Sequence, residues 1–150
     1  MKSRAVIFGC AGPRLTAEER RFFGRVDPLG LIVFARNVEA PAQLSDLAAE
    51  FRDSVGRADA PVLVDQEGGR VQRLKPPHWR AAPAAARFGE LASRNRAKAA
   101  EAARLNARLM GGELAAVDRG RGNPRHAHSA LPPTRLPISS GSHLQHRQQA

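Results

Sequence analysis

The fold is decided by residues 31–64, which read LIVFARNVEAPAQLSDLAAEFRDSVGRADAPVLV. Two short apolar runs, 31–34 and 61–64, flank a stretch whose apolar residues recur at helical spacing. The runs lack polar alternation, which is typical of strands covered on both faces in a parallel sheet. The stretch between them predicts a helix that opens at Pro41, where a missing amide proton costs little, and ends at Gly56. Residues 31–64 therefore predict a strand–helix–strand unit.

The same alternation extends to both sides of this unit. Residues 5–8 are another short apolar run and predict a strand. Thr16 and Glu19 have the spacing of a capping box, so we expect a helix over about 17–25. Residues 90–117 are rich in alanine and predict a helix that two adjacent glycines could break. Alternating strands and helices indicate an α/β fold with a parallel sheet.

The charge of the chain is unevenly distributed. Its 150 residues hold 24 Lys and Arg against 14 Asp and Glu, a formal net charge of +10 that first suggests a nucleic-acid partner. All the acidic residues lie within 1–118, whereas 119–150 contain five arginines and no acid or aromatic residue. Sparse arginines without aromatic residues do not favour nucleic-acid binding. We expect a folded domain over 1–117 and a disordered basic tail over 118–150, because the tail has too little apolar surface to fold.

Several classes of site and location are disfavoured by the sequence. The single cysteine, Cys10, excludes an internal disulfide, and no apolar stretch approaches the roughly 18 residues of a membrane helix. We therefore expect a cytoplasmic protein with no membrane partner. The histidine pairs of the tail lack cysteine or carboxylate companions, so we expect no metal site there (His126, His128, His143 and His146).

A polar segment, DQEGGRVQR at residues 65–73, follows the third predicted strand. Chemistry gathers at the carboxyl ends of strands in parallel sheets. Asp65 and Glu67 lie two residues apart, so an extended backbone would point both carboxylates to one side, which suggests a general acid–base pair. The two glycines allow positive φ or close approach to a ligand, and Arg70 and Arg73 offer donors to hydroxyls or carboxylates. The plain alternative is a structural salt-bridge network of these four charged residues.

Residues 64–73, VDQEGGRVQR, resemble the signature of the cytoplasmic bacterial β-N-acetylhexosaminidases of glycoside hydrolase family 3. Three further stretches agree with that family in order and spacing, namely 12–19, 28–37 and 41–44. The resemblance ends near Val117. Four motifs in register are more specific than any one of them.

The resemblance implies a fold and an activity. The fold is the N-terminal part, about three βα units, of a TIM-type (β/α)8 barrel. The activity is hydrolysis of terminal β-linked N-acetylglucosamine from peptidoglycan fragments in cell-wall recycling, with a muropeptide or saccharide as substrate and no metal or other cofactor. Asp65 and Arg73 would bind the sugar in the −1 subsite, which replaces the acid–base interpretation of Asp65 and Glu67.

The family's catalytic groups lie beyond the matched region. They are an aspartate nucleophile on a later strand and a histidine acid–base on a loop, so we expect no catalytic residue in this chain. A complete barrel takes roughly 200–250 residues. We therefore expect an incomplete chain that is inactive alone, with a frame change near Val117 as the hypothesis for the tail. The alternative function is a non-catalytic sugar-binding or regulatory fragment that keeps Asp65 and Arg73.

Overall fold

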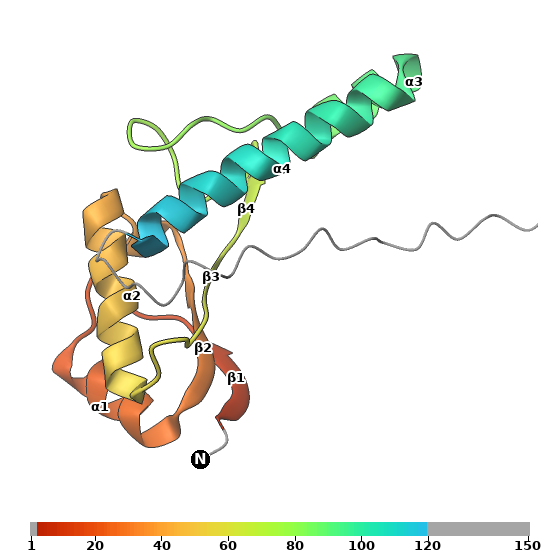
Figure 1. Cartoon of the computed structure of the whole chain (residues 1–150). Coiled ribbons are helices and arrows are strands. Elements are labelled where there is room, and N and C mark those ends of the chain that lie inside the picture. Colours follow the sequence, from red (N-terminus) through yellow and green to blue (C-terminus); the bar gives the residue numbers. More distant parts are fainter. Residues whose placement is uncertain (1–2, 120–150) are drawn as a thin grey trace, which may run out of the picture.

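A computed structural model describes residues 3–119 of the chain. Strands and helices alternate over the first half, as expected, and the elements are β1 (Arg4–Phe8), α1 (Ala17–Val26), β2 (Pro28–Val33), the short 3-10 helix η1 (Ala35–Asn37), α2 (Pro41–Val55), β3 (Val62–Val64), β4 (Gln66–Gly68), β5 (Val71–Gln72), α3 (Ala85–Arg94) and α4 (Arg96–Arg119). Strands β1, β2 and β3 form a parallel sheet in that order. Helices α1 and α2 lie together on one side of it (Figure 1). The prediction of an α/β fold with a parallel sheet is confirmed.

Local sequence signals set the limits of the first two helices. The Thr16 hydroxyl accepts a hydrogen bond from the Glu19 amide at 3.1 Å, and the Glu19 carboxylate accepts one from the Thr16 amide at 2.8 Å. This reciprocal pair is the predicted capping box at the start of α1. Helix α2 begins at Pro41 and is closed by Gly56, whose φ of +64° favours glycine.

The core lies between the sheet and these two helices. Leu31 and Val33 of β2 are 0% and 2% exposed, and they belong to one cluster with Phe23 of α1 and Phe51 of α2. The Phe23 and Phe51 rings meet edge to face with their centroids 5.4 Å apart. Helices α1 and α2 approach closely at Gly24, where an added Cβ would lie 2.9 Å from the Ser54 carbonyl oxygen.

The other face of the sheet is uncovered within the described residues. Ile7 pairs with Gly30 and Leu63 with Ile32, so the side chains of Ile7, Ile32 and Leu63 share the face turned away from Leu31 and Val33. Ile7 is 40% exposed and Leu63 is 38% exposed. We call this surface the open face. The expectation that the strands are covered on both faces is therefore wrong for residues 3–119, because α1 and α2 both pack on the same side.

The segment after β3 is more ordered than expected. In place of a loop, β4 and β5 pair antiparallel to form a hairpin. The helix expected over 90–117 is two helices, divided at Asn95, whose side chain accepts from the Lys98 amide at 3.0 Å and caps α4. The two adjacent glycines remain inside α4.

Helix α4 extends away from the sheet alongside α3, and its carboxyl end lies near α2 (Figure 1). An ion pair between Arg52 and Asp118, at 2.7 Å, joins α2 to α4. The helix continues through Arg119, so the expected domain boundary at residue 117 falls within its last turn. Residues 120–150 of the expected tail, with all four of its histidines, lie outside the described residues.

Candidate functional site

The structure brings Asp65 and Arg73 together at the carboxyl end of the sheet. Asp65 directly follows β3 and Arg73 directly follows β5. An Arg73 Nη2 atom lies 3.4 Å from Asp65 Oδ2, and the two side chains are 28% and 43% exposed. Glu67 and Arg70 are exposed, and in the part of the chain that the structure describes neither joins this pair. The expected network of four charged residues is thus reduced to one partly exposed ion pair.

Gln66 holds the backbone from which the Arg73 side chain extends. Its Oε1 atom accepts hydrogen bonds from the amides of Arg73 and Leu74, at 3.0 and 3.1 Å. Its Nε2 atom donates to the Leu74 carbonyl at 3.0 Å. The backbone of Arg73 is therefore fixed by Gln66 from the other strand of the hairpin, and Asp65 contacts only the guanidinium.

Gln72 joins the hairpin to the segment that crosses it. It is 3% exposed, and its Nε2 atom donates to the carbonyls of Leu74 at 2.7 Å and Arg80 at 2.6 Å. Its Oε1 atom accepts from the Ala82 amide at 3.0 Å. Neither Gln66 nor Gln72 was predicted from the sequence as part of the site. The available signal was a pair of uncharged amides, one on each strand of an otherwise charged segment.

The two glycines of the hairpin turn serve the protein's own packing. Gly68 and Gly69 have φ values of +88° and +61°. A Cβ on Gly69 would lie 2.6 Å from the Ala84 Cβ, and a Cβ on Gly68 would collide with the Pro83 carbonyl. Positive φ and close approach were both expected here, but the group that approaches is the chain's own segment 82–84 rather than a ligand.

The ends of β1 and β2 are joined by a buried amide that the sequence analysis also missed. Asn37 of η1 is 0% exposed, and its Oδ1 accepts from the Phe34 amide at 2.8 Å. Its Nδ2 donates to the carbonyls of Cys10 at 3.1 Å and Gly12 at 2.8 Å. Beside it, Arg36 donates to the Cys10 carbonyl at 3.1 Å. The edge of the sheet that carries Asp65 is therefore held by side-chain bonds to backbone groups.

Cys10 lies at this edge but is not an available nucleophile. Burial raises the pKa of its thiol to about 11, the Glu19 carboxylate adds to this increase, and Arg36 opposes it. The thiol is protonated at neutral pH, and the thiolate is the reactive form of cysteine. Cys10 therefore acts as a small buried side chain.

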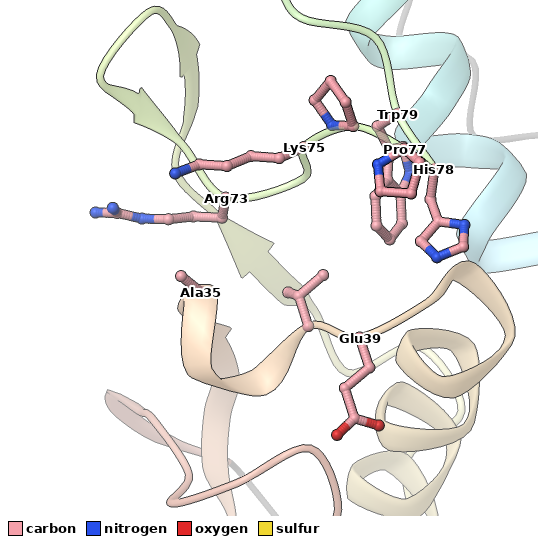
Figure 2. Close-up of a pocket in the computed structure, with 9 residues that line it drawn as sticks. Ala35, Glu39, Arg73, Lys75, Pro77, His78 and Trp79 are labelled. Atoms are coloured by element: carbon pink, nitrogen blue, oxygen red, sulfur yellow. The ribbon is translucent and has the colours of Figure 1, made fainter.

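A hollow of about 220 Å³ lies beside the ion pair. It separates the segment Ala35–Glu39 from the loop Arg73–Trp79, and its lining residues are Ala35, Val38, Glu39, Arg73, Lys75, Pro76, Pro77, His78 and Trp79. Figure 2 shows the Arg73 and Lys75 side chains extending in the same direction from this loop. The Trp79 side chain forms an apolar part of the lining and is mostly buried. The exposed His78 ring stands edge-on to the Trp79 ring, with the two ring centroids 5.8 Å apart.

This arrangement combines donors, an acceptor and an aromatic surface. Arg73 belongs to both the ion pair and the hollow, and its Nε atom is buried with no hydrogen-bond partner in the described structure. A small polar ligand with several hydroxyls suits such a set, because a carboxylate accepts from hydroxyls, a guanidinium donates to them, and a ring face covers apolar carbons.

Residues 3–119 contain neither a cluster of metal ligands nor a membrane-spanning helix. No group of three or more His, Cys, Asp or Glu side chains there lies close enough to hold a metal ion. No helix in that range has both the length and the apolar composition needed to cross a membrane.

The chain is similar to part of several curated proteins named beta-hexosaminidase. No protein-family model matches it. The Beta-hexosaminidase of Thioalkalivibrio sulfidiphilus is 43% identical over 112 residues, which is 75% of this chain and 32% of the relative. The Beta-hexosaminidase of Methylococcus capsulatus is 42% identical over 111 residues, or 74% of this chain and 31% of the relative.

Solved structures agree with these sequence matches. NagZ from Neisseria gonorrhoeae, in complex with N-trifluoroacetyl-D-glucosamine, superposes with a TM-score of 0.71 and 31% identity over 77% of this chain and 33% of that one. A glycoside hydrolase family 3 beta-N-acetylglucosaminidase from Paenibacillus sp. gives a TM-score of 0.62 and 29% identity over 74% of this chain and 20% of that one. The chain is therefore similar over about three quarters of its length to part of these beta-hexosaminidases and of a glycoside hydrolase family 3 enzyme, and it spans about one third of the length of the curated relatives it matches.

Proposed function

We propose that this chain supplies a sugar-binding part of a β-N-acetylhexosaminidase. The reaction is hydrolysis of terminal β-linked N-acetylglucosamine from peptidoglycan fragments during cell-wall recycling in the cytoplasm. The substrate is a muropeptide or saccharide that contains N-acetylglucosamine. In this proposal the described residues are an N-terminal portion of a (β/α)8 barrel.

The observation that carries the proposal is the Asp65–Arg73 pair beside the hollow. The two charged atoms are 3.4 Å apart, which is a long contact, and both side chains are partly exposed. A sugar hydroxyl can therefore donate to the Asp65 carboxylate while another accepts from the guanidinium. The Trp79 side chain, which lines the hollow from the same loop as Arg73, offers an apolar surface to the ring carbons. One relative of this chain is seen with an N-acylated glucosamine bound.

The same geometry argues that the chain binds the sugar without cleaving it. A retaining glycosidase needs a nucleophile and an acid–base residue about 5 Å apart across the glycosidic bond. Asp65 is paired with Arg73, and Glu67 is exposed and does not line the hollow. Asp65 therefore acts as a ligand of the sugar, and the reacting carboxyl and acid–base groups come from elsewhere in the enzyme. The second candidate, a non-catalytic sugar-binding fragment, rests on this same observation.

Binding of N-acetylglucosamine to the full chain tests the proposal. Trp79 is the single tryptophan of the sequence and lines the hollow, so its fluorescence reports binding directly. We expect saturable binding that Asp65→Asn weakens by roughly tenfold or more, because a neutral amide is a weaker acceptor than a carboxylate. The matched control is Glu67→Gln, the same loss of charge two residues away, which should leave binding unchanged. Equal effects of the two substitutions would refute the role of Asp65.

Turnover separates the enzyme proposal from the binding-fragment alternative. We expect the chain alone to release no chromophore from a chromogenic N-acetylglucosaminide. Robust turnover that Asp65→Ala abolishes would show that these residues carry out the whole reaction. Sugar binding without turnover, even when the rest of a family member is supplied, would favour the non-catalytic fragment.

A further inference from the structure

A partly buried carboxylate on α4 contacts the segment that follows the loop Arg73–Trp79. Glu113 Oε1 accepts a hydrogen bond from the Arg80 amide at 3.3 Å and lies 3.8 Å from Arg80 Nε. Glu113 Oε2 and Arg80 Nε are both buried, and neither has a hydrogen-bond partner in the part of the chain that the structure describes. The polar contacts of this carboxylate within residues 3–119 are therefore all with Arg80.

Helix α4 holds Arg80 at two places. Asn106 precedes Glu113 by about two helical turns, so the two side chains leave the same face of the helix. Asn106 is 8% exposed, and its Oδ1 atom accepts a hydrogen bond from Arg80 Nη2 at 3.1 Å. The Arg80 guanidinium is thus bound to Asn106, and the Arg80 backbone amide is bound to Glu113.

The Arg80 backbone also closes the loop that lines the hollow. Gln72 Nε2 donates to the Arg80 carbonyl at 2.6 Å and to the Leu74 carbonyl at 2.7 Å. Gln72 therefore joins the beginning of the loop Arg73–Trp79 to its end. The two residues proposed to contact the sugar, Arg73 and Trp79, each neighbour one of these bonded carbonyls in the chain.

An acidic residue is a costly choice at the Glu113 position. The side chains of Glu113 and Arg80 are only 25% and 32% exposed, and replacing a buried ion pair by apolar side chains is often neutral or stabilising. The buried Glu113 Oε2 atom adds a desolvation cost because it has no partner in the described structure. Stability alone therefore does not account for this carboxylate, whereas the position that it gives to the Arg80 backbone does.

We propose that Glu113 is a positioning residue of the sugar site. It does not line the hollow but holds the loop Arg73–Trp79 in place through Arg80 and Gln72. Without the Glu113 acceptor the loop occupies its binding position for a smaller fraction of the time, and the apparent Kd for the sugar rises in inverse proportion to that fraction. The identity of the ligand rests on the proposed function, whereas the anchoring of the loop rests on the distances alone.

Sugar binding by two variants of the full chain is the first test. Glu113→Met removes the acceptor but keeps an apolar side chain of similar length, so the chain should still fold. We expect this variant to weaken N-acetylglucosamine binding about fivefold or more, because one net hydrogen bond shifts an equilibrium by about this factor. Glu113→Gln keeps an oxygen that accepts from the Arg80 amide and should recover most of the loss. Unchanged binding in Glu113→Met, or equal losses in the two variants, would overturn the proposal.

The matched control is Asp118→Leu on the same helix. Asp118 forms the 2.7 Å ion pair with Arg52 of α2, so this variant also replaces an interacting carboxylate of α4 by an apolar side chain. That ion pair does not involve the loop, and sugar binding should remain unchanged. An equal loss of binding in Asp118→Leu and Glu113→Met would assign the effect to the helix as a whole and refute the role of Glu113.

Acrylamide quenching of Trp79 fluorescence without sugar separates the positioning role from the proposed function. Trp79 is the single tryptophan of the chain and is 8% exposed, so its quenching reports how closely the loop is held. Glu113→Met should increase the quenching, whereas Glu113→Gln and Asp118→Leu should not. Unchanged quenching in Glu113→Met would contradict the positioning role. Increased quenching in that variant, together with no N-acetylglucosamine binding by the unsubstituted chain, would refute the proposed function and still support the anchoring of the loop.

Discussion

Replacing Gln72 should destabilise the whole site, because this one side chain satisfies three backbone groups. In Gln72→Met, a substitution of similar length, the Leu74 carbonyl keeps the bond it accepts from Gln66. The Ala82 amide and the Arg80 carbonyl lose their hydrogen bonds to the Gln72 side chain, which are 3.0 and 2.6 Å long. An unsatisfied buried backbone group costs about 1–3 kcal/mol, and the half-buried Arg80 residue regains part of this from water. We expect a loss of about 2–4 kcal/mol in the free energy of unfolding.

Urea denaturation followed by Trp79 fluorescence and by circular dichroism measures this loss. The matched control is Glu67→Met on the same hairpin, which removes an exposed side chain and should change the free energy of unfolding by no more than about 0.5 kcal/mol. If the two substitutions destabilise the chain equally, the role assigned to the Gln72 hydrogen bonds is wrong.

Three other properties follow from the structure. Cys10, with a pKa of about 11, should react with iodoacetamide at pH 8 on the order of a hundredfold more slowly in the folded chain than in urea, and equal rates would contradict its burial. Burial raises the pKa of Glu19, but the hydrogen bonds from Thr16 and Ala11 outweigh it and hold the pKa below 4.5. The contribution of the Glu19 carboxylate to the free energy of unfolding is therefore complete above the pKa of the unfolded chain and is lost as pH falls through the lower pKa of the folded chain. Glu19→Gln should flatten the acid side of the pH profile of this free energy, which urea denaturation at several pH values measures. Gly24→Ala should destabilise the chain in thermal unfolding because its Cβ meets the Ser54 carbonyl, whereas Gly112→Ala meets nothing within 4 Å and should stabilise α4 by up to about 1 kcal/mol.

The features predicted well from the sequence depend on residues that lie close together along the chain. The capping box of Thr16 and Glu19 and the Pro41 and Gly56 limits of α2 are local signals, and the structure has all of them. The hairpin after β3 was missed because its turn is shaped by segment 82–84, which approaches from farther along the chain. The open face was missed because a continuous apolar run shows that a strand can be covered, not which neighbours cover it.

The candidate site was also predictable only where neighbouring residues in the sequence mark it. Asp65 could be placed because it directly follows an apolar run, and the family resemblance singled out Arg73. Asn37, Gln66 and Gln72 were missed because each satisfies backbone groups whose positions depend on the folded path of the chain. A buried amide in such a role has no sequence pattern of its own.

Different side chains of the segment that follows β3 fix its backbone and line the hollow. The Gln66 and Gln72 side chains hold the backbone, whereas Lys75 and His78 line the hollow with side chains that take no part in those bonds. Substitution of Lys75 or His78, both exposed, should therefore change the lining of the hollow and leave the backbone hydrogen bonds in place. The path of the backbone and the polar groups presented to the hollow are therefore set by different side chains of the same segment.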